Sequence, residues 1–302
     1  ENSGYMMRVS RLMSRIMKIM GLNGSSFAPL LLGFGCSVPA ILSTRRIETR
    51  SDRLVTIAVL PMMSCAGRLP IYMMFVSALF PSRLQAPVLF GIYASGVLLA
   101  LCCARLLKNT LFKAPQRDSL HHMKRLRLPS LRKVGILMWS RAFMYVRKAG
   151  TFILGASIIL WFLNTYPRPE EDTAPTNAAA MEHSYAGQIG HWMEPVTQVA
   201  GFDWKINSAL VGAFAAKEIF VTQMGILYAV EDGNSAPAAQ QTLNARLKAS
   251  YTPLQGISIM IFCLIALPCI GTVTVAKREA GTWWFALAQF GGLTLLGFAT
   301  AT

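Results

Sequence analysis

Apolar residues occur along this chain in long runs, several of which reach the roughly twenty residues that a helix needs to cross the hydrocarbon core of a bilayer. Membrane-spanning helices are predicted over residues 54–80, 87–107, 150–164, 254–275 and 283–299. Two further apolar segments, 27–42 and 209–230, contain glycine, proline or charged residues near their middles. The pattern predicts an all-α, polytopic helical membrane protein.

The charged residues are concentrated between the apolar runs. Residues 105–148 hold about a dozen lysines and arginines but one acid, Asp118, which predicts a cytoplasmic location. Within this segment, apolar residues recur at helical spacing over 131–146, and we expect a helix that lies along the membrane surface. Residues 167–203 carry six acids against one arginine, Arg168, and are expected outside.

The same charge rule predicts how the two interrupted segments enter the membrane. Segment 27–42 has basic residues on both flanks, so we expect a re-entrant hairpin whose two ends are cytoplasmic. The basic Lys277-Arg278 pair orients 254–275 inward, which makes 209–230 re-entrant from the opposite face. Opposed, discontinuous elements of this kind are typical of an inverted-repeat transporter with its site near the midplane of the membrane.

Composition limits the function classes. Hydrophobic residues make up 53% of the 302 residues and charged residues only 14%, against about 25% charged in soluble domains. The net charge of +15 comes from loop segments without interleaved aromatic residues, which argues against nucleic-acid binding. The sequence contains no Gly-x-x-x-x-Gly-Lys-Ser/Thr motif for binding nucleotide phosphates. It also shows no catalytic triad and no pair of carboxylates that would indicate an enzyme. The polar stretch 231–252, including 235–241, is expected to be an outside loop.

Two of the apolar segments break at a cysteine. The first break is Gly33-Phe34-Gly35-Cys36-Ser37-Val38-Pro39, and the second is Pro61-Met62-Met63-Ser64-Cys65-Ala66-Gly67-Arg68-Leu69-Pro70. Glycine and proline interrupt the helical hydrogen-bond ladder, and a bilayer tolerates this only where the backbone is buried in protein or lines a wet cavity. Because sulfur ligands select softer metals, we predict metal ligation by Cys36 and Cys65, with Met62 and Met63 as further candidates. The backbone breaks are assigned to Gly33, Gly35, Pro39, Pro61, Gly67 and Pro70.

Further along the chain, Cys269 follows Pro268 in an otherwise apolar run, which predicts a weaker break and a third thiol ligand. Lys217 and Glu218 lie inside an apolar segment, where ionisable residues are costly unless they are paired or face water. Glu218 would supply a carboxylate oxygen to the metal. The alternatives are that the cysteines are small buried apolar residues and that Lys217 and Glu218 form an internal ion pair or cap a helix. Three cysteines on unbroken helices are expected to pack: Cys102, Cys103 and Cys263.

Other short motifs accompany the two cysteine breaks: Glu1-Asn2-Ser3-Gly4-Tyr5-Met6, Leu30-Leu31-Leu32, Gly201-Phe202-Asp203-Trp204-Lys205, Ala215-Ala216-Lys217-Glu218 and Leu267-Pro268-Cys269-Ile270. With these motifs the chain resembles the membrane portion of the ferrous iron transport protein B family, over nearly its whole length. One departure is Arg68, which adds a cation to the second break.

The resemblance implies Fe(II) as the transported ion, taken up across the bacterial cytoplasmic membrane between two opposed gate regions. It also implies a GTP-binding domain outside these 302 residues, acting in cis or in trans, so GTP and Mg²⁺ would enter only through that domain. Small accessory iron-transport proteins are implied as partners beside the lipid bilayer, and the oligomeric state stays open. Since the chain begins at Glu1 without an initiator Met, we expect a fragment of a longer protein.

On this basis the chain divides into a first gate region (1–107), a basic cytoplasmic loop with a surface helix (108–148) and a second gate region with the last spans (149–302). No enzymatic activity is expected of the chain itself. Two other functions stay open: a carrier of nucleosides or other organic solutes built on similar broken helices, and a membrane scaffold or receptor that docks a soluble GTPase.

Overall fold

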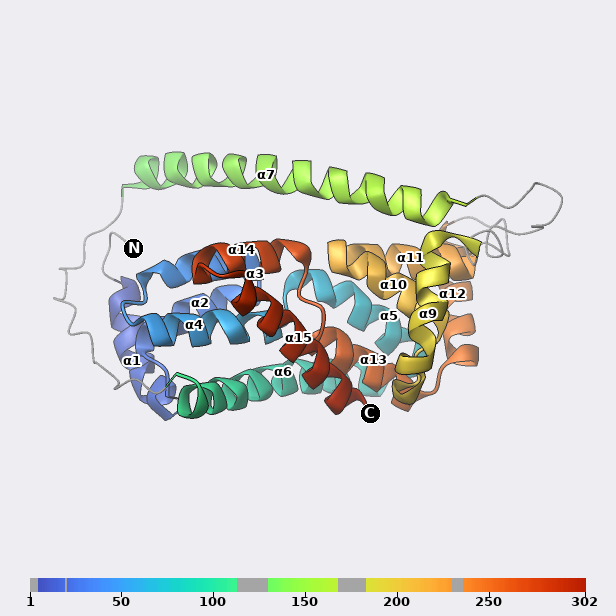
Figure 1. Ribbon diagram of the computed structural model, residues 1–302, viewed down its shortest axis with the longest axis horizontal. Helices are drawn as coiled ribbons and strands as arrows, with labels where there is room; N and C mark the ends of the chain where they lie inside the picture. The colour runs from blue at the N-terminus through green and yellow to red at the C-terminus, as the bar shows by residue number, and fades with distance from the viewer. Residues whose placement is uncertain (1–4, 20, 113–129, 168–182, 230–235) are drawn as a thin grey trace.

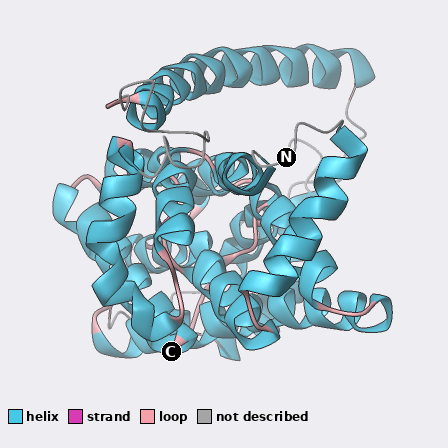
Figure 2. Cartoon of the chain, turned by 90° about the vertical axis from the view of Figure 1, so that its right-hand side faces the viewer, coloured by secondary structure: helices cyan, strands magenta, loops and turns pink. Residues whose placement is uncertain are grey.

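The computed structural model describes residues 5–19, 21–112, 130–167, 183–229 and 236–302. These residues form helices and connecting loops, without a strand (Figure 2). Glu1 and residues 113–129 of the basic segment expected at 108–148 lie outside the described residues.

Four helical stretches of the described chain are long and apolar enough to cross a bilayer: Arg50–Leu79, Ser82–Thr110, Pro253–Ala280 and Trp283–Ala301. They confirm four of the five expected spans and the all-α, polytopic class. The first and third are broken in the middle, whereas the other two are the single helices α6 (Ser82–Thr110) and α15 (Trp283–Ala301).

The fifth expected span belongs to a longer element. Helix α7 runs without a break over Leu131–Thr165, 35 residues, and only its part Leu154–Thr165 is recorded as an apolar stretch. The helix expected at 131–146 is present, but it is continuous with the span expected at 150–164, because Gly150 does not end the helix. A glycine in a helix interior costs only about 1 kcal/mol relative to alanine. Helix α7 runs along one side of the other helices and packs against α9 and α10 (Figure 1).

The remaining elements form two sets with the same order. Helix α1 (Tyr5–Ile19) precedes the first set, and α9 (Tyr185–Thr197) precedes the second. The first set contains α2 (Phe27–Gly33), α3 (Ser37–Ser43), α4 (Arg50–Val59), α5 (Leu69–Leu79) and then α6. The second contains α10 (Trp204–Ala215), α11 (Lys217–Ala229), α12 (Ala236–Ser250), α13 (Pro253–Ile265), α14 (Ile270–Ala280) and then α15.

Each set contains a hairpin, a broken span and an unbroken span, and the second set has α12 as an additional helix between its hairpin and its broken span. Helices α2 and α3 pack against each other, as do α10 and α11, so both interrupted segments fold back as hairpins. The two hairpins approach from opposite ends of the molecule (Figure 1). The second half of each hairpin packs against the second half of the other set's broken span, α3 against α14 and α11 against α5. This arrangement agrees with the expected pair of opposed, discontinuous elements.

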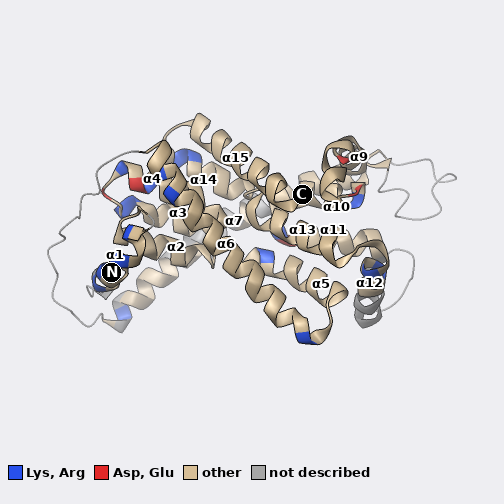
Figure 3. Cartoon of the chain, turned by 90° about the horizontal axis from the view of Figure 1, so that it is seen from below, with Lys and Arg blue, Asp and Glu red and all other residues tan. Residues whose placement is uncertain are grey.

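The distribution of charged residues differs between the two ends of the molecule. Lys and Arg side chains gather at the end that holds α1, the start of α4 and the end of α14 (Figure 3). The rule that cytoplasmic segments are enriched in Lys and Arg favours a cytoplasmic location for this end. The α2–α3 hairpin enters from this basic end and is called the cytoplasmic hairpin below, whereas the α10–α11 hairpin enters from the opposite end and is called the outer hairpin.

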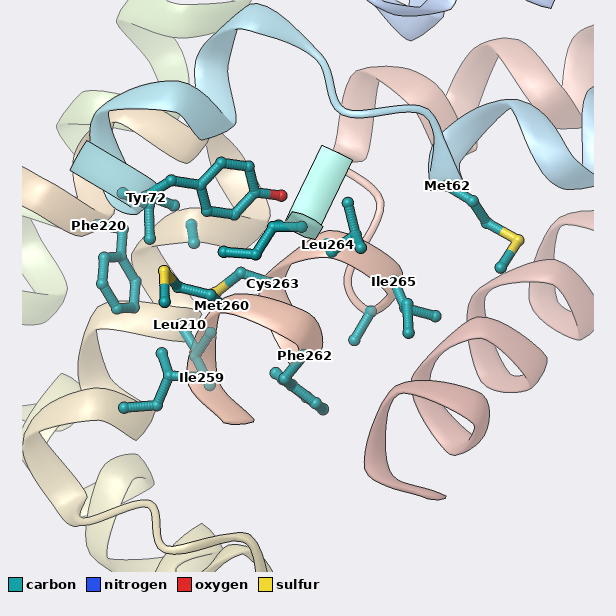
Figure 4. Packing of buried hydrophobic residues seen from close by; sticks show 14 of the residues in the cluster. Met62, Tyr72, Leu210, Phe220, Ile259, Met260, Phe262, Cys263, Leu264 and Ile265 are labelled. Atoms are coloured by element: carbon teal, nitrogen blue, oxygen red, sulfur yellow. The ribbon is translucent and has the colours of Figure 1, made fainter. Parts of the chain in front are cut away.

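The polar stretch expected as a loop at 231–252 is largely a helix. Helix α12 covers Ala236–Ser250 and packs against α5 and α11. Its buried residues Leu243 and Leu247 are four positions apart and therefore share one face, which the low overall hydropathy of the segment obscured. Between the two sets lies a single hydrophobic cluster, in which Tyr72 of α5, Phe220 of α11 and Cys263 of α13 lie close together (Figure 4).

Candidate functional site

The three candidate thiols occupy one structural position, the residue immediately before a helix. Cys36 precedes α3, Cys65 precedes the 3₁₀ turn Ala66–Arg68 that leads into α5, and Cys269 precedes α14. All three have extended backbones, with φ/ψ of −157°/130°, −75°/160° and −60°/152° respectively. The first N–H groups of a helix lack intrahelical partners and carry partial positive charge, so each thiol lies beside unpaired backbone donors.

The first two breaks are joined to each other. The backbone N–H of Ala66 donates to the carbonyl oxygen of Gly35 over 3.2 Å. Gly33 packs so closely on the second break that an added Cβ would lie 3.1 Å from Leu60 Cδ2 and 3.1 Å from Met63 Cβ. The tip of the cytoplasmic hairpin is therefore fixed against the middle of the broken span α4–α5.

The two methionines of the second break are buried in the hydrophobic cluster. Met62 is 1% exposed and Met63 is 2% exposed. Met62 lies at the edge of the region shown in Figure 4. In this conformation both thioethers serve as packing.

The third break is complete, so the expectation of a weak interruption at Cys269 is wrong. Helix α13 ends at Ile265 and α14 begins at Ile270. Between them Leu267 has φ of 52°, a left-handed conformation that is rare for residues other than glycine and costs roughly 1–3 kcal/mol. Pro268 favours this break because proline excludes the helical conformation of the residue before it.

The beginning of α14 lies beside the beginning of α3. A Cβ on Gly271 would lie 3.5 Å from Val38 Cγ2, and the two residues follow Cys269 and Cys36 by two positions each. The Cys269 sulfur lies 3.1 Å from the Thr272 hydroxyl oxygen. The first and third thiols thus start two neighbouring helices.

The outer hairpin has a tip of the same backbone shape without a cysteine. Ala216 separates α10 from α11 with φ/ψ of −149°/134°, close to the values of Cys36. Glu218 in the first turn of α11 lies over the second break, because a Cβ on Gly67 would come within 2.7 Å of Glu218 Oε1. A glycine at position 67 therefore leaves the space that this carboxylate occupies.

Arg68 donates hydrogen bonds within the second break. Its Nη1 group donates to the carbonyl oxygens of Pro61 over 2.7 Å and Met63 over 3.2 Å, and the residue is 2% exposed. Breaking the helix leaves backbone carbonyl groups without intrahelical donors, and a buried carbonyl needs a donor. Arg68 supplies it, which accounts for a cation at this position.

The prolines of the breaks lie where their missing N–H is harmless. Pro61 and Pro70 are in the first two positions of their helical turns, and Pro39 is the third residue of α3. The first N–H groups of a helix have no intrahelical acceptor, so proline starts these short helices rather than interrupting them.

The predicted ligands are not gathered into one metal site in this conformation. Among the described residues, no group of three or more His, Cys, Asp or Glu side chains could hold one ion. Cys36 is exposed, whereas Cys65 and Cys269 are half-buried. Of the cysteines expected to pack, Cys263 is buried in the hydrophobic cluster, Cys103 is half-buried and Cys102 is exposed on α6.

Sequence analysis missed two charged clusters near the cytoplasmic end. Glu279 at the end of α14 accepts hydrogen bonds from Arg45 Nε at 2.9 Å and Arg53 Nη2 at 2.6 Å, and its side chain is 3% exposed. Asp52 of α4 is fully buried and paired with Lys108 of α6. The only signal in the sequence was charge at the ends of apolar runs, which is common in membrane proteins.

Opposed hairpins, broken spans and converging helix starts define a polytopic helical membrane protein of the gate type. A family model described as "Gate: Nucleoside recognition" matches residues 1–79 and 146–283, and one described as "Ferrous iron transport protein B C terminus" matches 89–141. The chain belongs to the ferrous iron transport protein B family, as a membrane portion of it. It is a multi-pass protein of the bacterial cytoplasmic membrane.

Curated relatives carry the same family name. The Fe(2+) transporter FeoB of Campylobacter jejuni is 38% identical over 96% of this chain and 47% of the relative. The transporter of the same name from Helicobacter pylori is 34% identical over 99% of this chain and 51% of the relative. A fusion of Fe(2+) transport protein A with the transporter in Porphyromonas gingivalis is 38% identical over 95% of this chain and 38% of the relative. The chain spans about half the length, or less, of these relatives. No solved structure matches it.

Proposed function

We propose that this chain is the membrane permease portion of an Fe(II) uptake system. The observation that carries the proposal is that helix starts at four backbone breaks lie against one another. Three of these breaks carry the thiols, and the fourth is followed by the first turn of α11. Two hydrogen-bonding or packing relationships support it, Ala66 with Gly35 and Gly67 with Glu218. The names of the relatives indicate the ion.

The proposed ligands are Cys36, Cys65, Cys269 and Glu218. Since no three of them surround one ion in this conformation, Fe(II) would exchange part of its water shell for them in successive steps rather than in a closed site. Glu218 belongs to the outer hairpin and Cys36 to the cytoplasmic one, so the order from outside to inside is carboxylate first and Cys36 last. Partial ligation suits transport, because conduction requires sites weak enough to release the ion.

The partners are proposed on the same basis. A GTP-binding domain, in cis or in trans, would control the gates, and GTP and Mg²⁺ would act there rather than on this chain. A small accessory iron-transport protein is supported by the relative in which Fe(2+) transport protein A is fused to the transporter. In the domain division we keep 1–107 and 149–302 as the two gate regions, with 108–148 connecting them.

The decisive experiment compares uptake by the full-length protein and its Cys36→Ser variant in proteoliposomes. We expect Fe(II) uptake to fall strongly in the variant at unchanged membrane abundance, while Cys102→Ser, an exposed thiol on α6, keeps normal uptake. Normal Fe(II) uptake by Cys36→Ser would remove this thiol from the path.

A second candidate, transport of a nucleoside, is favoured by the description of the gate-family model. The same proteoliposomes separate the two candidates when they are offered Fe(II), Mn(II), Zn(II) and a radiolabelled nucleoside in turn. Uptake of the nucleoside that is indifferent to Cys36→Ser, with no metal flux, would replace the Fe(II) proposal.

A further inference from the structure

Lys217 is a cation that the fold has placed at the meeting point of the breaks. It is the first residue of α11, is 5% exposed, and its Nζ atom has no hydrogen-bond partner among the described residues. Helix α11 packs against the 3₁₀ turn Ala66–Arg68, which directly follows Cys65. Its Cβ lies 3.6 Å from the position of a Cβ on Gly67, so Lys217 and Glu218 both border the second break.

Three separate effects make a positive charge unfavourable at this position. Burial removes the ammonium group from water, which costs several kcal/mol in real proteins. The start of a helix carries partial positive charge, which repels a second cation. Arg68 adds a like charge from the 3₁₀ turn against which α11 packs. None of the three is offset by a hydrogen bond to Nζ in the described structure.

A comparison of the two hairpin tips shows that the fold does not require a lysine there. In the cytoplasmic hairpin the residue after the break is Ser37, which is also buried, at 8% exposed. The two tips have similar backbones, as the φ/ψ values of Cys36 and Ala216 show. A small polar side chain therefore fills the equivalent position without cost. Arg68, the neighbouring cation, donates to two carbonyl groups, whereas Lys217 donates to none among the described residues.

We propose that the Lys217 ammonium group is a tethered cation that occupies the thiol-lined path beside Cys65 when no metal is bound. This inference rests on the proposed function. A divalent ion must displace the ammonium group to reach the thiols, and the returning ammonium group helps to expel it. Lys217 thus lowers the affinity of the path for its ion without being a ligand.

The first test measures metal affinity in the purified full-length protein, with Co(II) and Fe(II) as probes under anaerobic conditions. We expect Lys217→Met to lower the Kd for both ions roughly tenfold, because one like charge is removed at close range. Co(II) should show stronger sulfur-to-metal charge-transfer absorption at equal concentration. Lys217→Arg, which keeps the charge, should stay near the wild-type Kd. Lys248→Met serves as the matched control, since Lys248 is exposed on α12.

The second test needs no variant and so does not depend on folding of a mutant. An amine-acylating reagent is applied to the wild-type protein with and without Fe(II), and labelling is followed by mass spectrometry. We expect labelling of Lys217 to rise several-fold with metal, while labelling of Lys248 stays constant. Unchanged Lys217 labelling, or an unchanged or weaker Kd in a folded Lys217→Met protein, overturns the inference. Absence of metal binding and uptake in the wild type would instead contradict the proposed function.

Discussion

The backbone N–H of Ala66 donates to the carbonyl oxygen of Gly35 across 3.2 Å, which joins the loop before α3 to the loop before α5. The two residues flank Cys36 and Cys65, so the hydrogen bond ties together the segments that carry the two thiols. The α2–α3 hairpin is thereby attached to the broken stretch Arg50–Leu79, which is long and apolar enough to cross a membrane. A shift of one break must move the other.

The packing of Gly33 on the second break predicts that Gly33→Ala is harmful. Its Cβ would lie 3.1 Å from both Leu60 and Met63, and overpacking of a buried site costs roughly 1–3 kcal/mol. We expect a lower midpoint of thermal unfolding in detergent and reduced uptake. Gly91→Ala is the control, because its Cβ on α6 would meet open space and should leave both quantities unchanged.

The contact between Gly67 and Glu218 predicts a different outcome for Gly67→Ala. The new Cβ would meet Oε1 of Glu218, the mobile end of a side chain, so the carboxylate is displaced while the backbone stays in place. We expect nearly unchanged thermal stability but reduced Fe(II) uptake, similar to the effect of Glu218→Gln. Gly225→Ala in α11, the helix that carries Glu218, should be neutral in both assays, since nothing lies near its Cβ. Wild-type uptake by Gly67→Ala would show that the position of the Glu218 carboxylate is unimportant.

The buried pair of Asp52 and Lys108 predicts a strong stability effect. Lys108 Nζ contacts Asp52 Oδ1 and also donates to Ser51 Oγ at 3.0 Å, and Asp52 is fully buried. Lys108→Met leaves a buried carboxylate without its counter-charge, which costs about 3–5 kcal/mol. We expect little folded protein from this variant by size-exclusion chromatography. The double variant Asp52→Asn with Lys108→Met should recover much of the yield, and equal yields of single and double variants would contradict the pairing.

The charged cluster at Glu279 predicts a coupling between the two sets of helices. Glu279 of the second set accepts from Arg45 and Arg53 of the first, and Arg53 also donates to the Glu279 carbonyl oxygen at 3.1 Å. Glu279→Gln removes the shared negative charge from between two arginines. We expect thermal unfolding a few degrees lower and a changed rate of uptake. Glu194→Gln, whose partner His191 lies within α9, should affect neither.

The sequence was informative wherever a local rule sufficed. Apolar run length predicted four helical stretches that are long enough to span a membrane, and the basic residues on both flanks of 27–42 predicted the hairpin that α2 and α3 form. Sequence rules were less reliable for α12 and α7. In α12 two leucines are buried by contact with other helices, and in α7 no tertiary contact is needed for the helix to continue through Gly150. The strength of the break at Cys269 was also underestimated, because a left-handed Leu267 is not predicted by any residue preference.

By itself, therefore, the sequence determined the membrane class, the predicted sidedness of the loops from their charge, and the cysteines at glycine or proline breaks. These depend on hydrophobicity and on backbone rules that act within a few residues. Only the tertiary structure decided that the breaks meet, that Arg68 is occupied by carbonyl groups, and that Lys217 is buried without a hydrogen bond in the described structure. The physical reason is that each relationship joins elements far apart in sequence, where burial and contact arise only after α3, α5, α11 and α14 have packed together.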